Sequence, residues 1–378
     1  MDDNKLRIAI TQGDANGIGM ELIFKTFASP EMFELCTPII YGSPKVAAYH
    51  KKALNLDVNF SIIQHASEAK PERLNLLAIS DEEVKIEFGT PNEAAAALAR
   101  KAIDRAVADC KAGIVNAIVN APVSEKHFFA AQEQPLSLSQ YIAKQLGETG
   151  ETLEMWLNEC LRITTLSGEL AIKDVANEIT KERIESTVRL LHNSLRRDFM
   201  ISIPRVAVLA LNPTLEDQPC KEEQEVISPA IKQLIAEGYT AFGPYQADSF
   251  FGNREFDTFD AVLAMYHDQA MIPFKALSYE GGVRLIMGLS AVVTSTDDEA
   301  LDGKAGQGVS NEIAFRHAIY LALDVYRNRK AYDQPFKNPL KKLYHEKRDE
   351  SDKVRFNVTK KKESNEEQQS RYDAQRDE

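Results

Sequence analysis

The feature that most constrains this chain is the alternation of short apolar runs with amphipathic segments of helical length. This alternation is typical of a largely parallel sheet whose strands are connected by helices packed on its faces. In the first half, it predicts strands at 7–11, 38–42 and 117–120 and helices at 20–27, 45–54 and 92–111. We therefore expect an α/β protein built from repeated strand–helix units.

The second half continues the pattern. Four apolar residues recur at helical spacing between 174 and 199, which predicts one amphipathic helix there: Ile184, Val188, Leu191 and Leu195. Nearly continuous apolar runs at 205–211 and 260–266 predict strands that are buried on both faces. Further predictions are strand segments within 283–294, interrupted at Gly288, and a long helix at 310–329 with Ser310 as its N-cap.

Length and composition separate a folded part from a tail. With 378 residues, 44% hydrophobic and 27% charged, the chain can bury a large core, and its length suggests two lobes. The character of the sequence changes after Asn338, and residues 346–378 are rich in Lys, Arg, Glu and Gln with almost no apolar residues. Such a segment buries too little to offset its ordering entropy. We predict a two-lobed unit over 1–337, with a cleft between the lobes, and a disordered tail over 338–378.

Charge and the start of the chain limit the partners and the location. The formal charge of −12 argues against nucleic acid or an anionic membrane as the main partner, because both attract a basic surface. A small molecule is the better expectation. The N-terminus has no long apolar segment, and no stretch reaches membrane-spanning length, which predicts a cytoplasmic protein. The four cysteines form no C-x-x-C pair, so neither a zinc knuckle nor a disulfide framework is indicated.

The first candidate site is the turn that follows strand 7–11. Its glycines allow a tight turn and a close approach to a ligand, and the next helix offers free N–H groups: the residues are Gly13, Asp14, Asn16, Gly17 and Gly19. The spacing is not G-x-G-x-x-G, so the dinucleotide fingerprint is absent. From these residues alone, a ligand-binding turn and a structural strand-to-helix connection are equally good interpretations.

Two further candidates lie near the apolar run 260–266. His267, followed by Asp268, could bind a metal or transfer a proton, although a structural histidine is the commoner case. Lys275 could hold a phosphate or assist proton transfer, with Asp248 to position it, although most such lysines are solvated surface residues. Ligands of open α/β sheets bind beyond the carboxyl ends of strands, where these residues are expected.

Five segments together resemble one enzyme family. They are Ile-Ala-Ile-Thr-Gln-Gly-Asp-Ala-Asn-Gly-Ile-Gly from residue 8, Val-Asn-Ala-Pro-Val from 119, Leu-Asn-Pro from 211, Phe-Gly-Pro-Tyr-Gln-Ala-Asp from 242 and Asp-Ala-Val-Leu-Ala-Met-Tyr-His-Asp-Gln from 260. In this order they resemble 4-hydroxythreonine-4-phosphate dehydrogenase over residues 7–329. The last segment is the most specific.

The resemblance implies a fold similar to that of the isocitrate and isopropylmalate dehydrogenases, and a homodimer in which the partner subunit completes the active site. It also implies that NAD or NADP oxidises the secondary alcohol of 4-phosphooxy-L-threonine during vitamin B6 synthesis, after which the product loses carbon dioxide. A divalent metal such as Zn²⁺, Mg²⁺ or Co²⁺, held by three histidines, would polarise the alcohol. The glycine turn is expected to contact the cofactor.

Carried over residue by residue, the resemblance is mixed. It places His267 on a metal-ligand position, Asp248 on a substrate-contacting aspartate and Lys275 on the substrate lysine, and it makes the last two the expected catalytic groups. The other two metal histidines are replaced by Glu169 and Thr214. One imidazole with one carboxylate and a hydroxyl is a weak site for a transition metal.

The substrate-binding positions also depart from the family. Where the family has Gly-His-Thr-Glu, residues 137–140 read Ser-Leu-Ser-Gln, so Leu138 replaces an imidazole and Ser139 remains as a possible substrate contact. The phosphate-side Asn and Arg fall on Arg284 and Val293, and Arg284 is expected to bind substrate. Three hypotheses remain: the family reaction with reduced or lost activity, a non-catalytic dimeric paralogue that binds a metabolite or a protein, and an enzyme for a related hydroxy acid.

Overall fold

The computed structural model describes the chain except for residues 1–4, 130–136, 214–219, 280, 302 and 338–378. Residues Met1–Gln334 form one compact unit. The predicted tail and Thr214 lie outside the described residues, so the expectations for them stay predictions. The predicted cleft between two lobes also stays a prediction.

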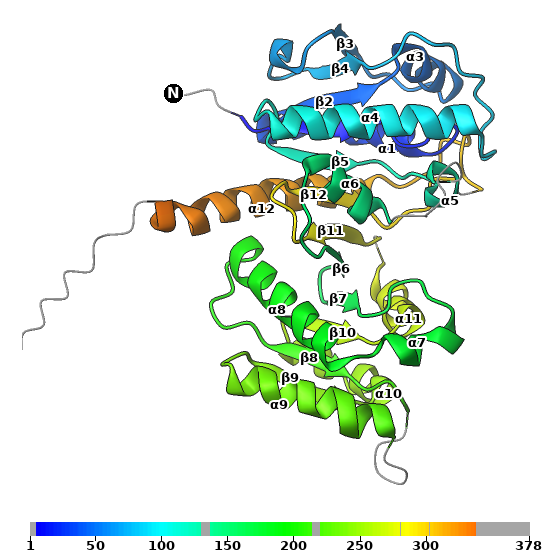
Figure 1. The fold of residues 1–378 in the computed structure, drawn as a ribbon. Coiled ribbons are helices and arrows are strands. Elements are labelled where there is room, and N and C mark those ends of the chain that lie inside the picture. Colours follow the sequence, from blue (N-terminus) through cyan, green and yellow to red (C-terminus); the bar gives the residue numbers. More distant parts are fainter. Residues whose placement is uncertain (1–4, 130–136, 214–219, 280, 302, 338–378) are drawn as a thin grey trace, which may run out of the picture. The chain divides into compact units, whose positions relative to one another are not determined.

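The strands of this unit form one sheet. Over the described residues it is 12-stranded, in the order β3-β4-β2-β1-β5-β12-β11-β6-β7-β10-β8-β9 (Figure 1). The strands are β1 Arg7–Thr11, β2 Thr37–Gly42, β3 Phe60–Ile63, β4 Leu74–Ala78, β5 Ala117–Asn120, β6 Leu153–Leu157, β7 Arg162–Thr165, β8 Val206–Leu209, β9 Ala241–Tyr245, β10 Ala261–Ala264, β11 Val283–Met287 and β12 Val293–Thr296.

Most neighbouring strands are parallel, and the exceptions lie in the middle of the sheet. Strand β11 pairs antiparallel with both β12 and β6, and β6 pairs antiparallel with β7. The flanking parallel strands are fully buried in β1, β2, β5, β8 and β10 apart from Arg7. The predicted α/β class with a largely parallel sheet is confirmed, whereas the antiparallel centre was not predicted.

Helices cover the two faces of the sheet. They are α1 Gly19–Thr26, α2 Met32–Leu35, α3 Pro44–Ala53, α4 Glu93–Lys111, α5 Glu125–Phe128, α6 Leu138–Leu146, α7 Ile172–Glu178, α8 Lys181–Asp198, α9 Ser228–Ala236, α10 Ala247–Gly252, α11 His267–Leu277 and α12 Ile313–Lys337. The Ala-rich α4 begins where predicted, because the Asn92 side chain accepts a hydrogen bond from the Ala95 N–H at 2.8 Å. Its buried alanines allow α4 to pack closely on β1, β2 and β5 (Figure 1).

Two predicted helices begin elsewhere. The segment 174–199 is not one helix, because Thr180 is extended and its hydroxyl caps the N–H of Arg183, which separates α7 from α8. The long helix begins at Ile313 rather than after Ser310. The Ser310 N–H donates instead to the buried Glu21 carboxylate at 2.8 Å, and the Asn311 side chain accepts from the Ile313 N–H. A local cap therefore sets the start of α8, and a tertiary contact of Ser310 contributes to the later start of α12.

One buried ion pair connects the second half of the unit. Arg329 on α12 binds Asp198 at the end of α8, with a shortest distance of 2.6 Å, and both side chains are almost fully buried. The same guanidinium donates to the carbonyl oxygens of Leu289 and Ala291, between β11 and β12. Because a buried charge must be paired to be tolerated, this contact fixes α12 against the centre of the sheet.

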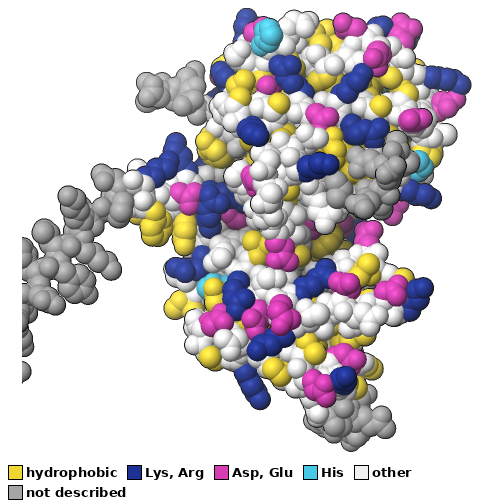
Figure 2. Space-filling view, viewed as in Figure 1, with side chains coloured by type: hydrophobic (Ala, Val, Ile, Leu, Met, Phe, Trp, Pro, Cys, Tyr) yellow, Lys and Arg dark blue, Asp and Glu magenta, His cyan; other side chains and the backbone are white. Residues whose placement is uncertain are grey.

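The visible surface carries charges of both signs. Figure 2 shows basic and acidic side chains interspersed over the visible face. Within the described part of the chain, no helix combines the length and the apolar character needed to cross a membrane.

Candidate functional site

The glycine turn after β1 packs against its own chain. A Cβ on Gly17 would lie 2.3 Å from the Ala300 carbonyl oxygen, and one on Gly19 would lie 2.5 Å from that of Gln12. Gly13 has a φ of +73° and would meet the Pro122 carbonyl oxygen. Glycine is required here because backbone occupies the space that a side chain would need.

Several polar groups of the same turn have partners within the chain. The Asn16 N–H donates to the Asp14 carboxylate at 2.9 Å, and the Asn16 amide donates to the Thr90 carbonyl oxygen at 2.7 Å. The Ile18 N–H donates to the Ala300 carbonyl oxygen. Burial raises the pKa of Asp14, and the Asn16 N–H partly offsets this rise. A cofactor contact by these residues stays a prediction.

Glu169 and His267 come together after two neighbouring strands. Strands β7 and β10 are parallel, and the pairing continues beyond them, where the Ser167 N–H donates to the Met265 carbonyl oxygen at 3.2 Å. Both side chains line one open hollow of about 400 Å³, beside Tyr266 and Asp268. His267 is the first residue of α11, and its Nδ1 lies 2.9 Å from the Asp268 carboxylate.

The donors in this hollow do not fit the metal site that the resemblance implies. Across the described residues, no three His, Cys, Asp or Glu side chains are placed to share one metal ion. His267 contributes one imidazole and Glu169 one carboxylate, while Thr214 is outside the described residues. A site for a transition metal normally gathers more nitrogen or sulfur ligands than this. We therefore assign no step to a metal.

Lys275 and Asp248, predicted to act together, lie on different helices. Lys275 on α11 is half-exposed, forms an ion pair with the Asp297 carboxylate and donates to the Asp297 carbonyl oxygen at 3.1 Å. Asp248 on α10 is exposed, and its carboxylate accepts the Ser249 N–H. Asp297, which follows β12, is thus the residue that holds the lysine. The neighbouring Asp298 carboxyl has a pKa raised mainly by burial.

Arg284 lies at the centre of a charge cluster, which we call the Arg284 cluster and define as Glu125, Glu154 and Arg284. Its guanidinium is 3.5 Å from the carboxylate of Glu125 on α5 and 3.4 Å from that of Glu154 on β6. Burial alone would lower the pKa of Arg284, but Glu154 and Glu125 raise it. Burial raises the pKa of Glu125, and repulsion by Glu154 adds to this rise.

Sequence reasoning missed both glutamates of this cluster. The signal for Glu154 was present, because it is an acidic residue within the apolar strand Leu-Glu-Met-Trp-Leu, where it shares a side of the strand with Trp156. Glu125 gave no such signal, since a short polar helix tolerates glutamate anywhere. Only the fold brings these two side chains to Arg284.

Similarity to known proteins identifies the family of this chain. Residues 34–322 match the family model described as pyridoxal phosphate biosynthetic protein PdxA. A protein of Bacteroides thetaiotaomicron named 4-hydroxythreonine-4-phosphate dehydrogenase is 45% identical over 361 residues, which cover 95% of this chain and 99% of that protein. The chain belongs to the PdxA family. Its members are NAD-dependent oxidoreductases, as the sequence predicted.

More distant relatives agree. A protein of Geobacter metallireducens with the same name is 32% identical, over 86% of this chain and 97% of that protein. The crystal structure of a 4-hydroxythreonine-4-phosphate dehydrogenase from Klebsiella pneumoniae has a TM-score of 0.73 at 27% identity, covering 86% of this chain and 99% of that one. For the enzyme from Burkholderia phymatum, the TM-score is 0.68 at 29% identity, with 85% and 98% covered.

One segment that departs from the PdxA pattern has a structural use in this chain. Residues 137–140 form a capping box that starts α6, in which Ser137 and Gln140 exchange hydrogen bonds. Leu138 is 4% exposed and belongs to the core, and the Ser139 hydroxyl lies 2.8 Å from that of Ser137. Where the family has an imidazole, this chain has a helix start and a core leucine. Substrate binding by Ser139 stays a prediction.

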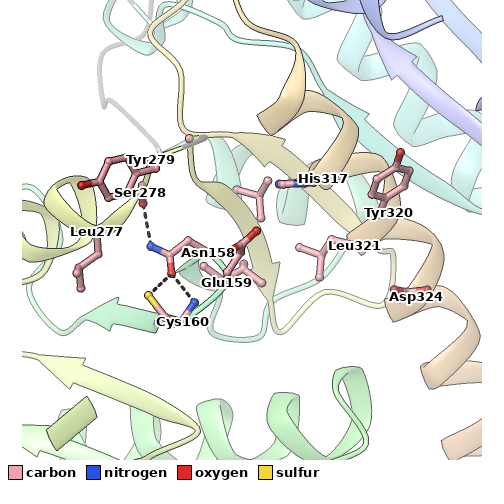
Figure 3. Close-up of a pocket in the computed structure, with 13 residues that line it drawn as sticks. Asn158, Glu159, Cys160, Leu277, Ser278, Tyr279, His317, Tyr320, Leu321 and Asp324 are labelled. Atoms are coloured by element: carbon pink, nitrogen blue, oxygen red, sulfur yellow. Dashed lines mark hydrogen bonds between the residues drawn. The ribbon is translucent and has the colours of Figure 1, made fainter. Parts of the chain in front are cut away.

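A second hollow, also of about 400 Å³, lies away from these residues. It is formed by the turn between β6 and β7, the end of α11, and His317, Tyr320 and Leu321 of α12 (Figure 3). Asn158 organises the turn, because its side chain donates to Ser278 at 2.9 Å and accepts the N–H groups of Cys160 and Leu161. None of the site residues predicted from the sequence lines this hollow.

Proposed function

We propose that this chain is an NAD-dependent oxidoreductase that oxidises the secondary alcohol of a small hydroxy amino acid. The observation that carries the proposal is the 45% identity, over nearly the full length of both chains, to a protein named 4-hydroxythreonine-4-phosphate dehydrogenase. The family's substrate, 4-phosphooxy-L-threonine, is the reference substrate. In its oxidation NAD accepts a hydride from the alcohol carbon, the hydroxyl proton is released, and the β-keto acid then loses carbon dioxide.

The proposed roles of the chain's own residues follow from their positions. Lys275 reaches the end of β12 and is oriented by Asp297, so its ammonium can bind the substrate or move the hydroxyl proton. His267, oriented by Asp268, can exchange a proton or accept a hydrogen bond at the open hollow. Asp248 is exposed and is available to a substrate group. A homodimer, as the resemblance implies, is part of the proposal, with the partner subunit completing the site.

The test is NADH formation by the purified full-length chain. NAD or NADP and 4-phosphooxy-L-threonine are supplied with zinc, magnesium or cobalt, and without added metal. The variant Lys275→Met is expected to lower kcat/KM by about 100-fold, the usual contribution of a proton-transferring group. The matched control is Lys232→Met, an exposed lysine on α9 that should leave the rate unchanged. No reduced cofactor under any of these conditions, with the phosphorylated or the unphosphorylated amino acid, would refute the proposal.

A second candidate function is that of a non-catalytic paralogue that binds a metabolite or a protein. Two observations favour it: the described residues gather no three-ligand metal site, and Leu138 is a core residue. Calorimetric titration with zinc and magnesium separates the two candidates. Tight binding of either ion that disappears in His267→Ala would count against the non-catalytic function. Exposed His65→Ala serves as the control histidine variant.

A further inference from the structure

The Arg284 cluster lies on the face of the sheet where the resemblance places the substrate phosphate. Arg284 on β11 is opposite Ser295 on β12, and Val293 is two residues from Ser295 on the same strand. Side chains two residues apart share a face of a strand, so Arg284 and Val293 occupy one face. Glu154 is opposite Ile286 on β11, which places it on this face as well. Both phosphate-side positions of the family thus share a face with Glu154, which contacts Arg284.

No cation replaces the family's arginine at Val293. Val293 is fully buried and packs in an apolar cluster with Ile118, Ile286 and Leu138. Of the two phosphate-side positions of the family, Arg284 is therefore the one that carries a positive charge in this chain. In the family pattern this position is an asparagine, so the chain has gained a guanidinium at one position and lost one at the other.

The gained guanidinium is not available to a ligand in the way a free arginine would be. Two carboxylates approach it at 3.4 and 3.5 Å, and its Nε also donates to the Thr296 carbonyl oxygen at 3.4 Å. With Glu125 and Glu154 ionised, the cluster has a formal charge of −1. With Glu125 protonated, Glu154 still neutralises Arg284. In neither state does the cluster present net positive charge.

The other cation expected to hold the phosphate is paired too. Lys275 binds Asp297, and Asp297 is mostly buried while the lysine is half-exposed. Glu169 adds a further negative charge whose field reaches Glu125. A phosphate dianion entering here would have to displace a carboxylate from Arg284 or lie beside it, and like charges in contact disfavour binding.

Resting on the proposed function, we propose that this site selects a hydroxy amino acid that carries no phosphate, and that Glu125 and Glu154 set this selectivity by neutralising Arg284. The ammonium and hydroxyl groups of such a ligand are compatible with an acidic cluster, whereas a phosphate is not. The relatives' reaction chemistry is unchanged by this choice, because oxidation of the alcohol neither forms nor breaks a bond of the phosphate ester on the neighbouring carbon. The change concerns which molecule is admitted.

The experiment compares three ligands by calorimetry on the full chain: 4-hydroxy-L-threonine, 4-phosphooxy-L-threonine and inorganic phosphate. The wild type is expected to bind the unphosphorylated amino acid at least about tenfold more tightly than the phosphorylated one. A tenfold difference in Kd corresponds to about one charge-assisted hydrogen bond. In Glu125→Gln/Glu154→Gln, Arg284 is released, and the ratio should move about tenfold or more towards the phosphorylated ligand. Exposed Glu151→Gln, three residues from Glu154, is the matched control and should keep the wild-type ratio.

The proposal is overturned if the wild type binds the phosphorylated amino acid as tightly as the unphosphorylated one, or if the double variant leaves the ratio unchanged. If the double variant does not fold, the two single variants are measured against the same criterion. If the wild type binds neither amino acid, the proposed function fails, but inorganic phosphate still tests the selectivity. Tighter phosphate binding by the variant than by the wild type supports the role of the two glutamates, and equal binding refutes it.

Discussion

The glycine turn after β1 and the Arg284 cluster are two places where the resemblance predicts ligand binding, and the structure treats them differently. In the turn, the chain's own backbone occupies the space that a side chain at the glycines would need, and Asn16 binds Asp14 and Thr90. In the cluster, three charged side chains from distant segments meet at partly exposed positions. Packing against backbone therefore restricts the turn to glycine, whereas the cluster is held by charge interactions between side chains.

The largest effect is expected when one methyl group is added to the turn. Gly17→Ala places a Cβ 2.3 Å from the Ala300 carbonyl oxygen, and backbone cannot move aside cheaply. We expect a loss of about 3 kcal/mol in the free energy of unfolding, measured by urea denaturation, as for other overpacked sites. Gly150→Ala is the control, because that glycine is exposed and has no atom within 4 Å of the added Cβ. Equal stability of the two variants would show that the turn is open after all.

The next effect concerns the charge at the centre of the cluster. Arg284→Met leaves Glu125 and Glu154 near each other without their shared cation. We expect the free energy of unfolding to fall by about 2 kcal/mol at neutral pH, less than for a fully buried pair because the Arg284 side chain is 20% exposed. Thermal or urea unfolding measures it. An unchanged stability would mean that the three groups do not interact in solution.

A smaller, pH-dependent effect comes from Glu125. Its pKa in the folded protein is raised by burial and by Glu154, so between its ordinary value of 4.5 and that raised value the folded state binds more protons than the unfolded one. In this window the ionisation of Glu125 destabilises the fold as pH rises. Glu125→Gln should remove this loss and gain roughly 0.5 kcal/mol at neutral pH, a small value because solvent screens a side chain that is 35% exposed.

The check on this prediction is the pH profile of unfolding. The difference between Glu125→Gln and the wild type should grow through the window and stay constant above it. A difference that shrinks as pH rises would mean that Arg284 dominates and that the pKa of Glu125 is lowered.

The smallest effect is expected at Lys275, where the ion pair with Asp297 is half-exposed. Lys275→Met should change the free energy of unfolding by about 0.5 kcal/mol or less, as is usual for surface pairs. Together with a large loss of activity, this would mark Lys275 as a functional group rather than a structural one. A loss of stability as large as that of Arg284→Met would mean that Lys275 has a structural role like that of Arg284.

Much of the fold could be predicted from local patterns. The strand at 117–120 and the helix beginning after Asn92 lie where the sequence placed them, because alternation and capping are properties of neighbouring residues. The pattern did not predict the break between two helices at Thr180, whose side chain caps the second helix. It also did not predict that Ser310 would bind the distant Glu21 instead of starting the long helix. For the site, the pairing of Glu169 with His267 in one hollow follows from parallel neighbouring strands, but the sequence did not indicate which strands are neighbours.

The sequence alone predicted the alternation of strands and helices and the family of the chain. The resemblance that it carries also predicts where metal and phosphate ligands are replaced. The assembled fold was needed to show the antiparallel centre of the sheet, the backbone packed against the turn glycines and the meeting of Glu125, Glu154 and Arg284. The reason is physical: a local pattern fixes which residues form a strand or helix, whereas charge neutralisation depends on side chains that are far apart in the chain and adjacent only after the sheet has assembled.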